Sequence, residues 1–286
     1  MSTLATTPAG QRWRDLRKRA LSAALLGPAA IACVWLGAEA WTALMAAAVA
    51  VLAWEWVRLC GYSTRRLPGV AVPLTVLVAG AFAVQGAVLL ALGVLASGTV
   101  LAWALGQPTP FRRAVSPAWL ALGVAQIGLA GISLIHLRAD NAAGLSNVVF
   151  LFLVVWASDI GAYLAGRHFG GPKLAPRVSP NKTWSGAAGG LFFAMAVGAL
   201  AAYFSGMAPS AAVLARAAGL AGLLGLVSQA GDLFESWMKR RFDVKDSSSL
   251  IPGHGGLLDR LDGMLTAAPA AALISLMLGA GVPLWR

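Results

Sequence analysis

The chain has 286 residues, of which 58% are hydrophobic and 12% are charged, and its formal net charge is +11. Soluble domains have about 25% charged residues, so this composition excludes an ordinary soluble protein and indicates one that lies largely within a lipid bilayer. The positive charge does not indicate nucleic-acid binding. The basic residues form short clusters between apolar segments, as expected for loops beside anionic lipid headgroups.

The N-terminal segment has the outline of a signal peptide, because the basic residues at 12–19 precede an apolar run and a small-residue site at 38–40. Another apolar segment begins at once with Trp41, so we interpret the run as an uncleaved first membrane span. The cysteines, Cys33 and Cys60, have neither metal-ligand spacing nor the pattern of a disulfide framework. We expect both to be small buried side chains.

Nine apolar segments are predicted to cross the bilayer as helices. A span takes about 20 apolar residues, and somewhat fewer where the bilayer adapts. The predicted fold class is therefore an all-α integral membrane protein, with residues 1–286 forming a single polytopic domain. The predicted spans cover approximately residues 20–37, 40–59, 70–84, 87–105, 116–136, 146–166, 184–205, 213–238 and 264–284.

The distribution of basic residues supports nine spans and predicts a cytoplasmic N-terminus. With this orientation, all 22 lysines and arginines fall on the cytoplasmic side except Arg138, Arg216 and Arg286. Cytoplasmic loops carry an excess of Lys and Arg, and an even number of spans would break this asymmetry. We therefore predict a multi-pass protein of the inner (cytoplasmic) membrane.

Acidic residues concentrate near the C-terminus, and carboxylates are costly at a membrane, so this cluster predicts a functional site. One pair lies on one face of a helix end, and a second i, i+3 pair opens the last apolar helix. Two carboxylate pairs that face each other can hold Mg²⁺, which prefers oxygen ligands. The alternative from spacing alone is a solvated loop with alternating charges. The acidic residues of the cluster are Asp232, Glu235, Asp243, Asp246, Asp259 and Asp262.

A loop rich in cations, glycine and proline lies between the two carboxylate pairs. Residues 239–246 read KRRFDVKD, and residues 252–256 read PGHGG. The basic side chains suit a polyphosphate ligand, and a flexible backbone leaves its N–H groups free to approach one. His254 can be a proton donor, a phosphate contact or an ordinary loop residue.

A second polar segment, residues 167–185, falls on the same predicted side of the membrane and contains Asn181 and Lys182. Its basic residues are equally well explained as ordinary flanks of cytoplasmic helix ends. Asp159 lies inside the preceding span, where a carboxylate needs a partner or a polar cavity. We therefore expect Asp159 to line the same site.

Residues 236–262 read SWMKRRFDVKDSSSLIPGHGGLLDRLD, and this run closely resembles the signature of the phosphatidate cytidylyltransferases, or CDP-diacylglycerol synthases. The segment SPNKT, residues 179–183, is similar to a second cytoplasmic segment of that family. The resemblance is strong over about residues 156–265, the expected catalytic segments, and depends on hydropathy alone over the N-terminal helices, residues 1–145. One position departs from the family pattern, because Ser185 stands where a glutamate is common.

The resemblance implies an enzyme of phospholipid biosynthesis that transfers CMP from CTP to phosphatidic acid, giving CDP-diacylglycerol and pyrophosphate at the cytoplasmic face. It also implies a homodimer and a centre of one or two metal ions, Mg²⁺ first. The motif places Asp232 and Asp259 as the first metal ligands, with Glu235 and Asp262 as additional ones. The other candidate residues are catalytic (Lys239, Arg240, Lys245, Asp246, His254 and Arg260) or substrate-binding (Ser179, Asn181, Lys182, Ser236, Gly255 and Gly256).

The reaction explains why the candidates include many positively charged side chains and few side chains that could act as a general base. A phosphate has a second pKa of about 6, so its oxygen is already anionic and needs little help from a base. The harder task is to bring two anions together, which metal ions and positioned cations do. A CTP-dependent membrane lipid kinase, transferring the γ-phosphoryl group, is the nearest alternative. A transporter would instead place polar residues near the middle of several spans.

Overall fold

A computed structural model describes residues 27–106, 116–140, 142–205, 209–251 and 255–286. Two short strands, β1 (Lys173–Ala175) and β2 (Ser179–Thr183), form an antiparallel hairpin between two of the helices. The helices in this part of the chain are Gly27–Leu36, α2 (Ala38–Leu59), α3 (Ala71–Val84), α4 (Val88–Leu105), α5 (Pro117–Ala139), α6 (Gly144–Phe169), α7 (Trp184–Tyr203), α8 (Ala211–Arg241) and α9 (Leu258–Leu278).

Each predicted span overlaps one of these helices, which confirms an all-helical membrane fold; residues 20–26 of the first predicted span lie outside the described residues. Within the described residues, seven helices are long and apolar enough to cross a bilayer, while Gly27–Leu36 and α3 are shorter. The last span was predicted too late in the chain: α9 begins at Leu258 and ends at Leu278, where Gly279 adopts a φ of 93°. The hairpin was not predicted, because strands of three and five residues are too short for a periodic pattern.

Local sequence determines where three of the long helices begin. The side chains of Ser116, Thr183 and Ser210 accept a hydrogen bond from the first turn of α5, α7 and α8. Such caps satisfy a backbone donor that a helix start leaves unpaired. Thr183 is both the last residue of β2 and the cap of α7, bonding the Gly186 N–H at 3.1 Å. Lys182, the preceding residue of β2, is therefore held close to the start of α7.

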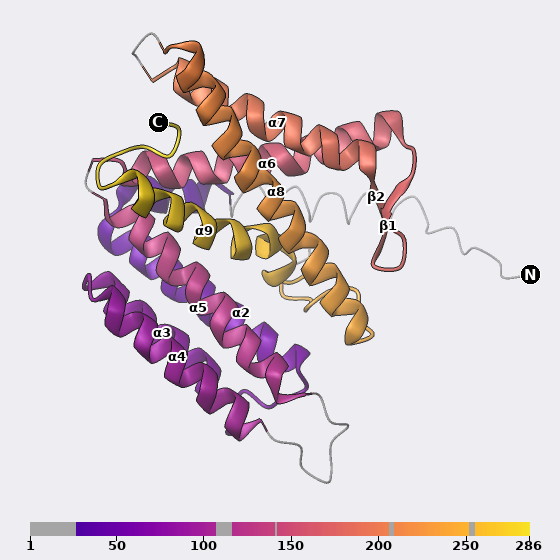
Figure 1. Cartoon of the computed structure of the whole chain (residues 1–286). Helices are drawn as coiled ribbons and strands as arrows, with labels where there is room; N and C mark the ends of the chain where they lie inside the picture. The colour runs from indigo at the N-terminus through magenta and orange to yellow at the C-terminus, as the bar shows by residue number, and fades with distance from the viewer. Residues whose placement is uncertain (1–26, 107–115, 141, 206–208, 252–254) are drawn as a thin grey trace, which may run out of the picture.

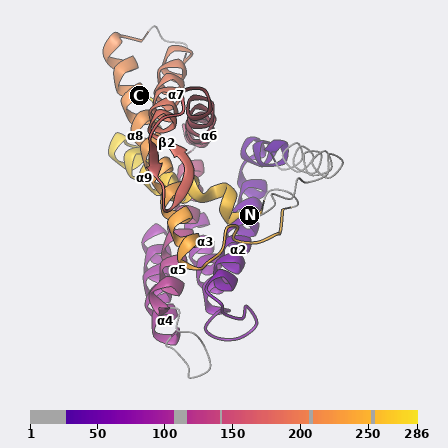
Figure 2. The ribbon, with the colours of Figure 1, turned by 90° about the vertical axis from the view of Figure 1, so that its right-hand side faces the viewer.

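The helices form two groups, and α9 contacts both. In both ribbon views α6, α7 and much of α8 lie at one end of the molecule, while α3 and α4 lie at the other (Figures 1 and 2). The first group consists of α6, α7 and α8, and the second of α3 and α4 together with α2 and α5, which pack against them. α9 packs against α6 and α8 of the first group and against α2 and α5 of the second. Because α9 carries Asp259 and Asp262 near its beginning, these residues lie where the two groups meet.

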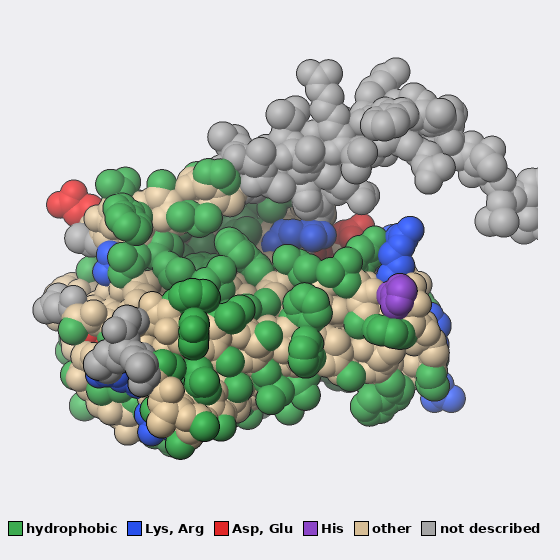
Figure 3. Space-filling view, turned by 90° about the horizontal axis from the view of Figure 1, so that it is seen from above, with side chains coloured by type: hydrophobic (Ala, Val, Ile, Leu, Met, Phe, Trp, Pro, Cys, Tyr) green, Lys and Arg blue, Asp and Glu red, His purple; other side chains and the backbone are tan. Residues whose placement is uncertain are grey.

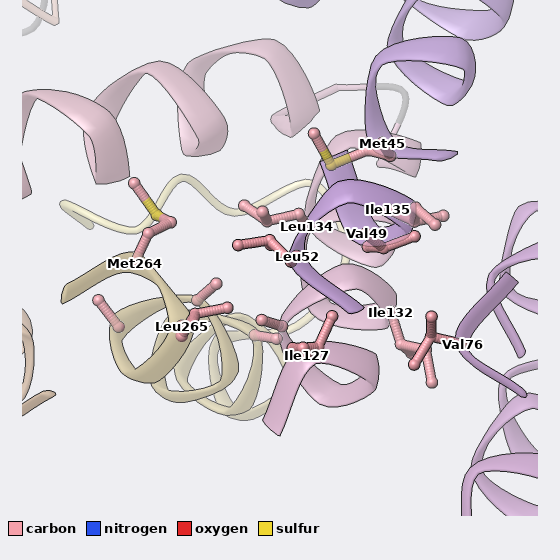
Figure 4. Packing of buried hydrophobic residues seen from close by; sticks show 14 of the residues in the cluster. Met45, Val49, Leu52, Val76, Ile127, Ile132, Leu134, Ile135, Met264 and Leu265 are labelled. Atoms are coloured by element: carbon pink, nitrogen blue, oxygen red, sulfur yellow. The ribbon is translucent and has the colours of Figure 1, made fainter. Parts of the chain in front are cut away.

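A hydrophobic core extends through the helices, and Figure 4 shows the part of it where α2, α3, α5 and α9 pack together. In a bilayer, lipid tails are as apolar as these side chains, so their packing stabilises the fold chiefly through close contact. The core holds α2 of the first half of the chain against α9 of the second. The buried side chains labelled in Figure 4 are Met45, Val49, Leu52, Val76, Ile127, Ile132, Leu134, Ile135, Met264 and Leu265.

Helices α6 and α7 approach each other through glycines. A Cβ atom at Gly189 would lie 2.2 Å from the Cβ of Ala165, and one at Gly190 would lie 2.7 Å from the carbonyl oxygen of Ser158. Neither position has room for a larger residue. Small residues at a contact let membrane helices come close enough for their backbones to touch, so this pair forms a tightly packed wall.

The C-terminal tail is fastened at the end of α5 and the start of α6, away from the hairpin (Figure 1). The N–H groups of Ala143 and Gly281 donate to Asp140 at 3.0 and 2.6 Å and hold the pKa of that carboxyl below its ordinary value. The Leu284 N–H donates to Asn147 Oδ1 at 2.9 Å. The polar groups at this end therefore bond the protein's own backbone.

Both cysteines are free thiols, as expected. Cys60 is buried and Cys33 is half-buried. Burial raises the pKa of the Cys60 thiol to about 12, so this side chain stays protonated and unreactive near neutral pH.

Candidate active site

A cavity of about 590 Å³ lies between α6, α7, α8 and the hairpin. Its wall includes alanine, glycine and leucine residues together with the charged side chains of Asp159, Arg167, Lys182 and Asp232. Seen from above, the surface is largely hydrophobic, and basic and acidic side chains lie next to each other among the hydrophobic ones (Figure 3). A cavity that joins an apolar wall to a few convergent polar groups suits an amphiphilic ligand.

The hairpin brings a lysine into this cavity. Lys182 forms an ion pair with Asp232 of α8, and both side chains are partly exposed. In the hairpin register, Lys173 lies opposite Thr183, and Arg240 Nε near the end of α8 donates to the carbonyl oxygen of Val178 at 3.4 Å. The segment predicted from residues 167–185 therefore reaches the same place as the acidic helix end, although the two are far apart in sequence.

Asp159 of α6 and Asp262 of α9 lie near Asp232 of this pair, so carboxyl groups from three helices are close together. The carboxyl group of Asp262 in α9 lies close enough to those of Asp232 in α8 and Asp159 in α6 to interact with both. Asp159 in turn interacts with Lys182 and Arg260. Like charges held this close raise the energy of the site unless cations compensate them. The arrangement therefore attracts cations, and it fits the expectation that Asp159 lines the site.

A second ion cluster lies nearer the end of α8. Lys239 Nζ lies 2.6 Å from Asp259 Oδ1 and 3.1 Å from Glu235 Oε1. The three side chains are 12%, 5% and 3% exposed, so water does little to weaken their attraction. The two predicted carboxylate pairs therefore lie across from each other: Asp232 is near Asp262, and Lys239 joins Glu235 to Asp259.

Asp259 also organises the loop that precedes α9. Its Oδ2 accepts hydrogen bonds from Gly256 N–H at 2.8 Å, Ser247 N–H at 2.9 Å and Ser247 Oγ at 3.0 Å. Lys239 binds the other oxygen, Oδ1, so both oxygens of this carboxylate have partners within the protein. The loop N–H groups expected to be free for phosphate are therefore bound by the protein itself at this point.

The remaining predicted residues lie around these two clusters. Asn181 lines the cavity, and Ser179 and Ser236 are half-buried. Lys245 and Asp246 are exposed in the loop, and Gly255 adopts a φ of 82° before the buried Gly256. His254 lies outside the described residues. Ser185, at the position that departs from the family pattern, bonds the Gly170 carbonyl oxygen and Thr183.

Two polar residues at this site were not predicted from the sequence. Gln229 Nε2 donates to Ser158 Oγ at 3.1 Å and to the Ala187 carbonyl oxygen at 3.3 Å, which ties α8 to α6 and α7 beside the cavity. Glu55 of α2 is fully buried and accepts bonds from the loop before α9. The rule that singled out Asp159, a carboxylate inside an apolar segment, applies equally to Glu55.

Among the described residues, no group of three or more His, Cys, Asp or Glu side chains is arranged to hold a metal ion by itself. Mg²⁺ does not need such a group, because it usually binds one or two carboxylates together with water and substrate phosphate. Asp232 and Asp262 place two carboxyl groups next to each other, and both can supply oxygen ligands. The donor set therefore fits a Mg²⁺ ion that completes its shell from a phosphate substrate.

The fold and the site define a multi-pass membrane protein with an internal charged site. The sequence model described as the Cytidylyltransferase family matches residues 17–278, and the chain belongs to that family. It is 40% identical over 274 residues to the phosphatidate cytidylyltransferase of Brucella suis biovar 1 (strain 1330), covering 89% of this chain and 91% of the relative.

Two more distant bacteria have similar proteins. The phosphatidate cytidylyltransferase of Pseudomonas aeruginosa is 38% identical over 276 residues, with 94% of this chain and all of the relative covered. That of Haemophilus influenzae is 34% identical over 282 residues, with 89% and 96% covered. The similarity therefore extends well beyond the signature into the N-terminal helices, where the sequence alone had indicated only shared hydropathy.

Proposed function

We propose that the chain is a phosphatidate cytidylyltransferase, which makes CDP-diacylglycerol and pyrophosphate from CTP and phosphatidic acid. The observation that supports this most is the Lys182–Asp232 pair inside a cavity whose wall combines other polar side chains with apolar ones. Phosphatidic acid has a charged headgroup and apolar chains, so its enzyme needs both surfaces side by side. Membership of the Cytidylyltransferase family supplies the nucleotide half of the reaction.

In this reaction a phosphatidate oxygen attacks the α-phosphorus of CTP. One P–O bond forms there, the bond to the oxygen that bridges to the β-phosphorus breaks, and pyrophosphate leaves with the electron pair. The attacking oxygen is already anionic at neutral pH, so no strong base is required. The protein must instead hold two polyanions together, and Lys182 and Arg260 beside the carboxylate cluster are suited to that task.

We assign Mg²⁺ to Asp232 and Asp262, because their carboxyl groups lie close together and come from different helices. The ion supplies positive charge for the phosphates when it is bound. Asp259, predicted as a first ligand, stays a candidate one turn earlier on α9, and Lys239 is the group it would release to bind the ion. A second metal ion stays a prediction.

The other predicted residues have supporting parts in this proposal. Lys239 holds Asp259 and Glu235 in place, and Arg240 fastens α8 to the hairpin. Lys245 is exposed in the loop and is available to a phosphate that enters from water. The substrate-binding roles of Ser179, Asn181, Ser236, Gly255 and Gly256, and the catalytic roles of Asp246 and His254, stay predictions.

Product analysis tests the proposed reaction. Purified protein in detergent with phosphatidic acid, Mg²⁺ and α-labelled CTP should give labelled CDP-diacylglycerol and unlabelled pyrophosphate. A lipid kinase would leave the label in CDP and transfer the γ-phosphoryl group to the lipid. Label that stays in CDP contradicts the proposal. Omitting phosphatidic acid is the control, and it should abolish labelled lipid.

We also propose that the site faces the cytoplasm from the inner membrane and that the enzyme is a homodimer. The C-terminal part of α8 and the N-terminal ends of α7 and α9 converge on the site. The predicted cytoplasmic side is also the one that collects most of the basic residues. Helices that alternate in direction explain why these particular ends meet.

With nine spans and a cytoplasmic N-terminus, Arg286 is expected on the periplasmic side. A reporter fused after Arg286 that is active only in the cytoplasm should therefore be silent, while the same reporter placed in the loop after α8 should be active. Activity of the C-terminal fusion would contradict the span count or the orientation.

A further inference from the structure

Glu55 is a buried carboxylate that the proposed reaction does not yet use. It lies on α2 in the first half of the chain and is 0% exposed. Its oxygens accept hydrogen bonds from the backbone N–H groups of Leu257 at 2.9 Å and Leu258 at 2.7 Å, and from Ser248 Oγ at 2.6 Å. Every one of these donors belongs to the loop before α9 or to the first residue of that helix.

The charge of Glu55 is stabilised by a helix start rather than by a cation. The donors that lie within 3 Å of its oxygens are two backbone N–H groups and the Ser248 hydroxyl, which are uncharged. A buried charge is costly unless it is paired or fully hydrogen-bonded. The unpaired N–H groups and the dipole at the beginning of a helix stabilise an anion, so Glu55 occupies a place at α9 that would otherwise suit a phosphate.

Glu55 and Asp259 both accept hydrogen bonds from the loop before α9. The hydroxyl of Ser247 lies 3.0 Å from Asp259 Oδ2 and 3.5 Å from Glu55 Oε2. The two carboxylates together bind backbone or side chain of Ser247, Ser248 and the segment 256–258. The start of α9, and with it the first carboxylate of the site, is therefore held by a residue of the N-terminal half.

The position of Glu55 is itself well fixed. Its neighbour Trp56 donates from Nε1 to the carbonyl oxygen of Trp119 at 2.8 Å, which ties α2 to α5. The Trp119 ring packs on Trp237 and Phe242 at the end of α8, with centroids 5.6 and 5.4 Å apart. The carboxylate is thus attached to a frame that also contacts the helix bearing Lys239.

We infer that Glu55 is a positioning residue for the nucleotidyl transfer: by binding Ser248 and the start of α9, it sets the placement of Asp259, Arg260 and Asp262. This inference rests on the proposed function for its effect on turnover. It makes a separate structural claim about the loop, which can be measured without substrate.

The test replaces Glu55 with glutamine, which keeps the size but has one acceptor oxygen and an NH₂ group that faces N–H donors. We expect kcat to fall about 10-fold, in the range found for groups that orient site residues, with KM for CTP changed less than about twofold. Amide hydrogen exchange at Leu257 and Leu258 should become faster, because local opening of the loop costs less free energy. The matched control is Glu39→Gln, at an exposed position of the same helix, which should change neither quantity.

Ser248→Ala removes one donor and leaves the carboxylate in place, so it tests the same contact if Glu55→Gln does not fold. It should speed exchange at the two amides and lower kcat about threefold. Wild-type turnover together with wild-type exchange in these variants overturns the inference. Wild-type protein that makes no CDP-lipid contradicts the proposed function instead, and the exchange measurements still decide whether Glu55 holds the loop.

Discussion

Asparagine in place of Asp232 is expected to lower turnover at least about 100-fold while the protein still folds and inserts. The substitution keeps the shape of the side chain but removes the charge that pairs with Lys182 and acts on Asp262. A lost metal ligand or phosphate-positioning group costs this much in comparable sites. Turnover should be measured over a range of Mg²⁺ concentrations, and the concentration for half-maximal activity should rise.

Asp243→Asn is the control for this measurement. Asp243 belongs to the same acidic cluster, is exposed, and has a φ of 56°, a conformation that asparagine adopts readily. Its replacement should leave turnover and the Mg²⁺ requirement unchanged. An Asp232→Asn protein with wild-type turnover would remove Asp232 from the site.

The same titration separates Asp262 from Asp259. Asp262→Asn should raise the Mg²⁺ requirement as Asp232→Asn does. Asp259→Asn should lower turnover by freeing Lys239 and the loop, without that rise. If Asp259→Asn shifts the Mg²⁺ requirement as strongly as Asp232→Asn, then Asp259 is a metal ligand, as the signature alone predicts.

Alanine in place of Lys182 is expected to lower turnover about 100-fold, the typical effect of removing one positioned charge at a phosphate or oxyanion site. Lys182 is the cation that the hairpin places in the cavity, where it pairs with Asp232. The product assay with phosphatidic acid and CTP measures the effect, and membrane insertion should be unchanged.

Lys173→Ala provides a control within the same hairpin. Lys173 is exposed at the start of β1 and lies opposite Thr183 in the register. Its replacement by alanine therefore removes one positive charge, as Lys182→Ala does, but at a position outside the cavity. Its loss should weaken only attraction to anionic lipid, worth about 1 kcal/mol for a basic residue near the surface. Equal effects of the two substitutions would mean that residues 167–185 are a membrane flank and not part of the site.

The helices of this protein could be predicted well from the sequence, because a membrane span is a long, uniformly apolar segment. The same property explains the errors at helix ends. α9 begins at Leu258 with charged Asp259 and Asp262 in its first turns, and hydropathy alone places its start later. The ion pairs between Lys182 and Asp232 and between Lys239 and Asp259 join segments whose spacing gives no sign of which charges meet.

The loop before α9 shows what the signature leaves open. Its glycines and cations suggested backbone N–H groups free for phosphate, whereas those of Gly256, Leu257 and Leu258 bind Asp259 and Glu55. The sequence correctly indicated that this loop binds an anionic group, but the groups bound are the protein's own carboxylates, those of Asp259 and Glu55. A contact of this kind depends on packing between distant helices, which short-range spacing does not record.

Gly256 restricts which substitutions the chain can accept at positions 55 and 256. A Cβ atom there would lie 2.0 Å from Ser247 Oγ and 2.6 Å from Glu55 Oε1. The absence of a side chain at 256 thus makes space for one that comes from α2. A chimaera that joins N-terminal helices from one relative to catalytic segments from another must inherit positions 55 and 256 as a matched pair.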